Sequence, residues 1–199
     1  MNSPETSPIH IEGHLGEGNR AIFLDRDGVI NEDRGYVGSW DQFKFLDGAI
    51  EGVKSLNLLG YRVIIVTNQS GIARGYYSHD QFIELTIKML EEFMNHGSRV
   101  DAVYACPHHP SKQTNRCNCR KPLPGLILEA ISRYELSAEH SFLVGDKESD
   151  ISAAKAAGIH KTALVRNSAT NYKETNSAAR WYVEDLIEFS NVIKKIHDC

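Results

Sequence analysis

The amino-acid sequence predicts an α/β fold in which a parallel β-sheet is covered by helices on both faces. Short apolar runs rich in Val, Ile and Leu alternate with longer segments whose apolar residues recur at helical spacing. That alternation is typical of a parallel sheet whose strands are joined by helices. In addition, acidic, hydroxyl and amide side chains directly follow several apolar runs, at the edge where ligands bind in such sheets.

Five apolar runs are predicted to be strands. Residues 61–68 (YRVIIVTN) form the clearest one, because a continuous run of β-branched side chains is expected of a strand buried on both faces. The other runs are shorter, and several end on polar residues. In chain order, the predicted strands are residues 20–27, 61–68, 100–106, 141–146 and 161–167.

Five further segments are predicted to be helices. Residues 47–60 carry apolar side chains at helical spacing and end at a glycine. Residues 78–97 begin at Ser78, a suitable N-cap, and end at Gly97, which favours the end of a helix. The other predicted helices are residues 122–137 after the prolines, 148–158 and 185–197.

Length and composition indicate one domain with its own core. The chain has 199 residues, of which 41% are hydrophobic and 24% charged, enough to bury a core without disulfides. We expect residues 1–20 to be a flexible leader and residues 21–199 to form a single domain. The net charge of -4 does not favour binding to nucleic acid or anionic lipid. With neither a long apolar run nor a secretory signal, we expect a cytoplasmic monomer that binds no membrane.

Five polar side chains at the predicted strand ends suit phosphoryl transfer. Asp25 can attack phosphorus, while Asp27 can protonate the leaving alcohol and later take a proton from water. Asp25 and Asp146, with the backbone carbonyl of Asp27, can hold Mg²⁺, which prefers oxygen ligands. Thr67 and Lys121 can hydrogen-bond and neutralise the phosphoryl oxygens. One acid at a strand end is usually a helix cap or a solvated residue, so the prediction depends on the whole set.

Four motifs in this region resemble those of a known superfamily. DRDGV, VTN, RKP and GDKESD occur in the order and spacing of the haloacid-dehalogenase (HAD) phosphatases. The similarity extends from residue 21 to residue 166. It implies a Rossmann-like core without a large cap domain, an aspartyl-phosphate intermediate and Mg²⁺, and it gives the five side chains the roles described above. Val29 stands where many relatives carry Thr, which affects the turn more than the chemistry.

Four soft metal ligands in residues 106–119 are predicted to bind a structural Zn²⁺. Three thiolates and one imidazole make a closed tetrahedral shell, and cysteines crowded in a cytosolic protein indicate a metal before a disulfide. His109 is an alternative to His108, which the resemblance favours. A bound ion would order the loop and direct the following Arg120 and Lys121 at the phosphate. The predicted ligands are Cys106, His108, Cys117 and Cys119.

The zinc loop is similar to that of two HAD families, the D,D-heptose 1,7-bisphosphate 7-phosphatases and the histidinol-phosphate phosphatases. The stretches NEDRGYV, FKFLDG, TNQSGIARG and CPHHP favour the first. That resemblance implies hydrolysis of the C7 phosphate of a heptose bisphosphate in nucleotide-activated heptose synthesis for lipopolysaccharide or another surface glycan. Arg120 suits the retained anomeric phosphate, because a guanidinium binds phosphate with two hydrogen bonds. The resemblance places near the substrate Asp33, Arg34, Gly35, Tyr36, Asn68, Gln69, Ser70, Arg120 and Lys147.

Three alternatives stay open. The cationic amine of histidinol phosphate would need an acidic pocket, whereas Arg120 suits an anion. A polynucleotide 3′-phosphatase shares the VTNQSGI stretch, but the sequence shows no evident basic or aromatic face for nucleic acid. A non-catalytic phosphate-binding module would be expected to lack Asp25 or Asp27. Asp150 is equally suited to the first turn of a helix and to supporting Lys121, and Arg74 to substrate binding and to a surface role.

Overall fold

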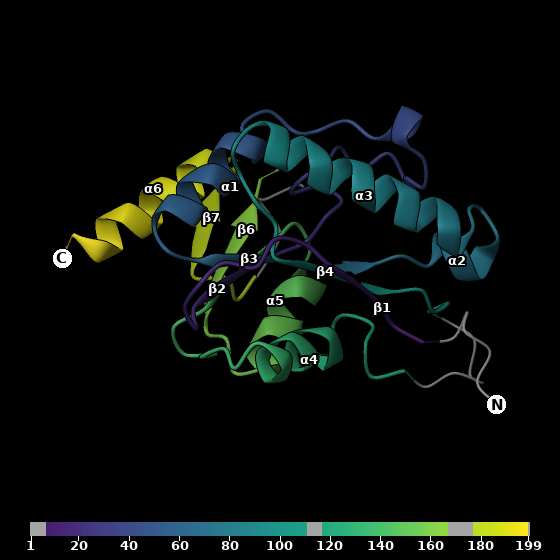
Figure 1. The fold of residues 1–199 in the computed structure, drawn as a ribbon. Helices are drawn as coiled ribbons and strands as arrows, with labels where there is room; N and C mark the ends of the chain where they lie inside the picture. Colours follow the sequence, from purple (N-terminus) through teal and green to yellow (C-terminus); the bar gives the residue numbers. More distant parts are fainter. Residues whose placement is uncertain (1–6, 111–116, 167–176, 199) are drawn as a thin grey trace.

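The protein, represented by a computed structural model, is described over residues 7–110, 117–166 and 177–198. Within these residues a seven-stranded sheet has the order β1-β4-β3-β2-β5-β6-β7 (Figure 1). Strand β1 is antiparallel to β4, and all other neighbours are parallel. The strands are β1 (Ile9–Glu12), β2 (Ala21–Leu24), β3 (Arg62–Asn68), β4 (Ala102–Cys106), β5 (Phe142–Gly145), β6 (Lys161–Val165) and β7 (Trp181–Val183).

Helices cover both faces of the sheet. In Figure 1, α1, α3 and α6 lie above the strands, and α4 and α5 lie below them. A short helix, α2, precedes α3, and a 3₁₀ turn, η2, precedes α1. Their bounds are η2 (Trp40–Gln42), α1 (Ala49–Leu58), α2 (Gly71–Arg74), α3 (His79–Asn95), α4 (Gly125–Arg133), α5 (Glu148–Ala156) and α6 (Leu186–His197).

Alternation along the central strands divides the core into two layers. In β2, Ile22 and Leu24 belong to the cluster that includes apolar residues of α1, α3 and α6. Ala21 and Phe23 belong to the cluster formed with α4 and α5. Both sets are fully buried, because successive side chains of a strand point to opposite faces and both faces are covered here.

The five predicted strands and five predicted helices are present, and the α/β fold class is confirmed. Helix α3 is capped by Ser78, whose hydroxyl accepts from the backbone amide of Gln81, while the Gln81 side chain accepts from the backbone amide of Ser78. This capping box satisfies two backbone donors at the helix start. The elements not predicted from the sequence are β1, β7, α2 and η2.

The structure differs from the prediction of a flexible leader, because residues 9–12 form strand β1. This strand pairs with β4 along its whole length, and Ile9 is buried. The ring of His10 stacks on Tyr104 at a centroid distance of 4.4 Å. A four-residue strand leaves little pattern in the sequence, and its role depends on the otherwise open edge of β4, which it covers.

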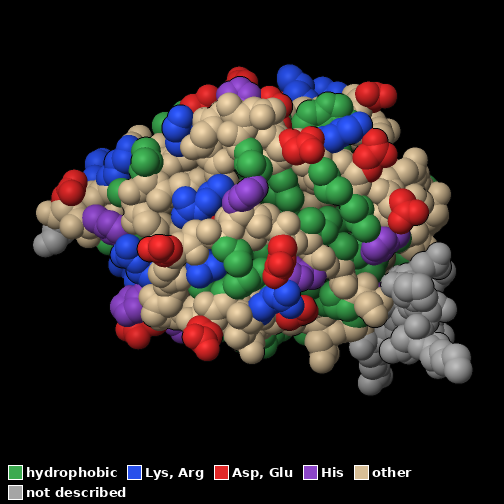
Figure 2. All heavy atoms as spheres, viewed as in Figure 1, with side chains coloured by type: hydrophobic (Ala, Val, Ile, Leu, Met, Phe, Trp, Pro, Cys, Tyr) green, Lys and Arg blue, Asp and Glu red, His purple; other side chains and the backbone are tan. Residues whose placement is uncertain are grey.

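Acidic and basic side chains are interspersed over the face of the molecule drawn in Figure 2, with apolar side chains between them. This mixed distribution agrees with the small net charge of -4. Among the helices in the described part of the chain, none combines the length and the apolar character that crossing a bilayer requires.

Two substitutions in residues 1–20 test the docking of β1. Ile9→Ala should lower the free energy of unfolding by about 2 kcal/mol, because it leaves a cavity beside β4. Leu15→Ala is the matched control, since Leu15 is 56% exposed and its truncation should change stability by less than about 0.5 kcal/mol. Urea unfolding measures both. A flexible leader would instead predict the same negligible effect for the two variants.

Candidate active site

Polar side chains gather at the carboxyl ends of β2, β3 and β5. Leu24 of β2 lies opposite Ile65 of β3 and Val144 of β5, so the residues that follow these strands meet at one edge. A cavity of about 510 Å³ opens there. Its lining residues are Asp25, Asp27, Asp33, Gly35, Tyr36, Thr67, Asn68, Gln69, Ser70, Tyr77, Arg120, Lys121, Lys147, Ser149 and Asp150.

The buried ammonium group of Lys121 lies at the base of this cavity. Its Nζ atom is 2.9 Å from Asp25 Oδ1 and 2.6 Å from Asp150 Oδ1, and it donates to the carbonyl oxygen of Val66 at 2.7 Å. Burial lowers the pKa of Lys121, but attraction to the carboxylates of Asp150 and Asp25 outweighs burial and raises it to about 12. Lys121 is therefore a fixed positive charge beside Asp25.

Asp25 is held among like charges. Burial, joined by repulsion from the neighbouring Asp150, Asp146 and Asp27, raises the pKa of the Asp25 carboxyl group to about 7, against the opposing influence of Lys121. Oxygen atoms of Asp25, Asp146 and Asp150 all lie within 4.8 Å of one another. Such a group of buried carboxylates suits a divalent cation, which would offset the excess negative charge.

Gly28 allows the segment after β2 to turn directly against Asp146. Its φ of +89° lies in the left-handed region, and a Cβ atom at this position would lie 2.5 Å from Asp146 Oδ2. Any other residue would therefore be strained and would displace that carboxylate. The glycine of the DRDG motif thus brings the turn that carries Asp27 close to Asp146.

Asp27 is oriented by a set of donors. The guanidinium of Arg26 contacts both carboxylate oxygens, at 2.9 Å for Oδ1 and 3.0 Å for Oδ2. Asn31 Nδ2 donates to Oδ1 at 3.0 Å, and Gln69 Nε2 donates to Oδ2 at 2.8 Å. Arg26 is itself buried and donates to the carbonyl oxygen of Val37. The direction of the Asp27 carboxylate is therefore determined by neighbouring side chains.

Asn68 joins the end of β3 to the segment that carries Lys121. Its Nδ2 donates to the backbone carbonyl of Lys121 at 3.1 Å, and its Oδ1 accepts from the backbone amide of Lys121 at 3.0 Å. Both polar groups of the side chain are used in this pair. Asn68 therefore fixes the position of the Lys121 backbone in addition to lining the cavity.

The cavity brings together most of the side chains that the sequence predicts near a substrate. Arg34 is the exception, since it pairs with Glu32 at 2.7 Å and its side chain is 52% exposed. Lys147 Nζ bridges Asp33 at 3.0 Å and Asp146 at 3.3 Å. Burial lowers the pKa of Lys147, but the attraction of nearby carboxylates, Asp146 first, outweighs it and raises that pKa. The mouth of the cavity thus carries a stable cation.

Sequence reasoning missed two lining residues and left the place of a third open. Ser149 lies within the GDKESD motif, which could have indicated it, whereas Tyr77 comes two residues after the end of the TNQSGIARG stretch and outside every motif. For Asp150 the sequence is compatible both with a role in the first turn of a helix and with a role beside Lys121. In the structure it does both, because Oδ2 accepts from the backbone amide of Lys147 at 3.0 Å while Oδ1 pairs with Lys121.

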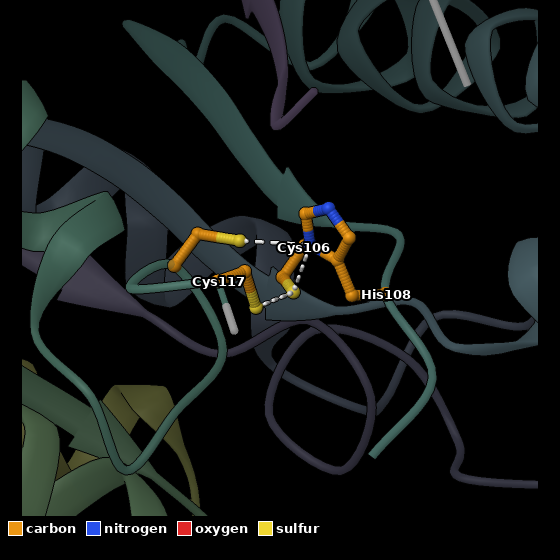
Figure 3. Close-up of side chains that lie close together, drawn as sticks. Cys106, His108 and Cys117 are labelled. Atoms are coloured by element: carbon orange, nitrogen blue, oxygen red, sulfur yellow. Dashed lines mark hydrogen bonds between the residues drawn. The ribbon is translucent and has the colours of Figure 1, made fainter. Parts of the chain in front are cut away.

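A second cluster follows β4, where two cysteines converge with His108 (Figure 3). The Sγ atoms of Cys106 and Cys117 are 3.8 Å apart. Nδ1 of His108 lies 3.4 Å from Cys106 Sγ and 3.1 Å from Cys119 Sγ. A tetrahedral ion with metal–sulfur bonds of about 2.3 Å gives sulfur–sulfur separations of about 3.8 Å. The cluster of Cys106, His108, Cys117 and Cys119 is therefore compatible with a zinc site.

Comparison with known proteins agrees with this geometry. The HAD-hydrolase-like family model matches residues 118–189. The D-glycero-β-D-manno-heptose-1,7-bisphosphate 7-phosphatase of Pasteurella multocida is 43% identical over 178 residues, which cover 88% of this chain and 97% of that protein. The enzyme of the same name from Escherichia coli K12 is 41% identical over 179 residues, which cover 88% and 94%.

This chain belongs to the heptose bisphosphate phosphatase family of HAD-like hydrolases. Like other members of this family, it is a phosphatase. A solved family member, the D,D-heptose 1,7-bisphosphate phosphatase of B. bronchiseptica, has a TM-score of 0.80 and 33% identity, with coverage of 88% of this chain and 98% of that one. That structure is complexed with magnesium and phosphate. The HAD-like sheet with helices on both faces, expected from four short motifs, is thereby confirmed.

Asp25→Asn should make the protein more stable above pH 7 when no magnesium is added. The pKa of Asp25 is about 7 in the folded state and therefore higher than in the unfolded chain. The folded protein thus has its full stability at pH values below the pKa of unfolded Asp25, and it loses part of that stability as the pH rises toward about 7 and Asp25 ionises. The variant escapes this loss, and its advantage should reach on the order of 1 kcal/mol. Urea unfolding at several pH values measures it. An advantage that was largest at pH 4 would contradict the assignment.

Proposed function

We propose that this phosphatase hydrolyses the C7 phosphate of D-glycero-β-D-manno-heptose 1,7-bisphosphate and leaves heptose 1-phosphate. The observation that carries the proposal is the 43% identity over 97% of a relative that bears this activity in its name. The cavity supports it, because cations at its base and its mouth suit a substrate with two phosphate groups. The relatives' name also supplies the β anomer, which the sequence alone leaves open.

In the proposed reaction, Asp25 is the nucleophile and Asp27 the acid and base. An Asp25 oxygen forms a bond to phosphorus while the bond from phosphorus to the C7 oxygen breaks, and Asp27 gives that oxygen a proton. Water then attacks phosphorus and loses a proton to Asp27, which frees inorganic phosphate and the Asp25 carboxylate. Thr67 and Lys121 stabilise the charge on the transferred phosphoryl group, with Lys121 already 2.9 Å from Asp25.

Asp25 and Asp146, with the backbone carbonyl of Asp27, are the groups that would hold Mg²⁺. The ion would screen the negative charge of the phosphate from that of the attacking carboxylate. The closeness of three buried carboxylates supports the site. Asp150 completes that group, but its contacts to Lys121 and to the Lys147 backbone favour a role in holding those residues.

Arg120 and Lys147 are proposed to bind the retained phosphate at C1. Both line the cavity, and the ion pairs of Lys147 are with Asp33 and Asp146. The guanidinium of Arg120 contacts the His108 carbonyl at 3.4 Å, so its position follows that of the zinc cluster. The sugar would then lie between the two phosphate-binding places, near Asp33, Gly35, Tyr36, Gln69 and Ser70.

The zinc cluster is proposed to have a structural role. Cys119 is two residues from Lys121, and Cys106 ends β4 beside Asn68 of β3, so an ion in the cluster would join two segments at the base of the cavity. Its four ligands leave no open position for chemistry. The cytoplasmic location, the monomeric state and the place in surface-glycan synthesis stay predictions.

Turnover of four phosphate esters tests the substrate. The β anomer of the heptose bisphosphate should be hydrolysed with a kcat/KM at least about tenfold above that of the α anomer, histidinol phosphate or a 3′-phosphorylated oligonucleotide, because the relatives are named for that anomer. Phosphate release measures all four. Preference for histidinol phosphate or the oligonucleotide would overturn the proposed substrate.

Substitution of Cys117 tests the role of zinc. Cys117→Ser should lose the ion, lower the melting temperature and reduce kcat by roughly tenfold, because the segment carrying Lys121 loses an anchor. Metal analysis, thermal unfolding and phosphate release are the measurements. Asp146→Asn is the control, since it should keep zinc and lose the response to magnesium. A zinc-free Cys117→Ser protein with full stability and activity would rule out a structural zinc.

A further inference from the structure

The ring of Tyr77 lies in a slot between two glycines. A Cβ atom at Gly38 would lie 2.1 Å from Cδ1 of this ring, and one at Gly71 would lie 2.3 Å from Cε1. The ring is buried, and any side chain at either glycine would displace it. Gly38 and Gly71, which follow the cavity-lining residues Tyr36 and Ser70 closely in the chain, thus fix the place of one hydroxyl group.

That hydroxyl donates to Oε1 of Gln69. The amide of Gln69 uses both of its own hydrogens, since Nε2 donates to Asp27 Oδ2 at 2.8 Å and to Thr67 Oγ1 at 2.9 Å. Gln69 is almost fully buried, so water does not easily replace these partners. One side-chain amide therefore contacts both the proposed acid and the proposed phosphoryl-binding hydroxyl.

The orientation of this amide matters because its two ends are opposite in character. If it turned over, the amide oxygen would face the Asp27 carboxylate and repel it. A donor at the oxygen end prevents that turn, and Tyr77 supplies one. Arg26 Nη2 supplies a second, longer contact at 3.3 Å. Because Thr67 accepts from Gln69, the hydrogen of its own hydroxyl stays available for a phosphoryl oxygen.

We propose that Tyr77 is a positioning residue that acts through Gln69 to hold Asp27 in line for protonating the leaving alcohol. The inference rests on the proposed function, in which Asp27 is the acid. It assigns Tyr77 no contact with the reacting atoms. It also gives Gln69, which the sequence suggested as a substrate contact, a second role as the link between Tyr77, Asp27 and Thr67.

The identity of the leaving group separates this role from a general effect on the site. A sugar alkoxide leaves only when its oxygen is protonated, whereas the acetate of acetyl phosphate leaves without a proton. Both substrates need Asp25, Thr67 and Lys121 equally. The ratio of their kcat/KM values, which report the first irreversible step, therefore isolates proton donation by Asp27.

Tyr77→Phe removes the hydroxyl and keeps the ring in its slot. It should lower kcat/KM for the heptose bisphosphate about tenfold, as expected for one lost hydrogen bond in a buried network, and lower that for acetyl phosphate less than about threefold. Gln69→Met should give a larger change of the same ratio. Tyr61→Phe is the matched control, because Tyr61 is buried and its hydroxyl bonds His197 at 2.9 Å, away from the cavity lining. It should leave the ratio unchanged.

Three results would overturn the inference. They are equal losses on both substrates, a higher KM for the heptose bisphosphate at unchanged kcat, and full activity of Tyr77→Phe. Asp27→Asn separates this failure from failure of the proposed function. If Asp27→Asn lowers the ratio and Tyr77→Phe does not, only the role of Tyr77 is wrong. If Asp27→Asn leaves the ratio unchanged, Asp27 is not the acid and both proposals fail.

Discussion

The site depends on the buried ion pairs that the ammonium group of Lys121 forms with two carboxylates. An ionised group is costly to bury unless charged and hydrogen-bonding partners surround it. Here the partners come from three places, with Asp25 after β2, Asp150 from α5 and the Val66 carbonyl from β3. The pairing therefore requires that these elements and the segment following Cys119 be assembled together.

Two kinds of contact hold Lys121 in place. The pairs with Asp25 and Asp150 fix its side chain, while Asn68 fixes its backbone through two hydrogen bonds. The cysteine cluster lies at the same junction of β3 and β4. The site thus holds its buried cation in a fixed position among several carboxylates. Burial and the repulsion between these carboxylates raise the pKa of Asp25, although Lys121 acts to lower it. Stability is given up locally for a nucleophile that has its charge partners in place.

Much of the fold can be predicted from residue patterns within short segments of the sequence. Strand β1 and the role of Tyr77 could not be predicted, because they depend on contacts between residues far apart in the chain. The β-branched run of β3 and the Ser78 cap of α3 are visible in the sequence because their causes are local. Strand β1 is not, since its four residues gain a role only beside β4, some 90 residues later. The acids of the site were predictable because parallel strands end at one edge. Tyr77 was not, because its function depends on the slot that Gly38 and Gly71 form around it.

Trapping of the covalent intermediate tests the central claim that Asp25 is the nucleophile. The enzyme is mixed with the heptose bisphosphate and quenched with borohydride, which reduces an aspartyl phosphate to homoserine, and peptide masses locate the change. Conversion at residue 25 is the expected result, with none in Asp25→Asn. Conversion at another acid, or a phosphorylated residue elsewhere in an enzyme that is turning over, would contradict the account.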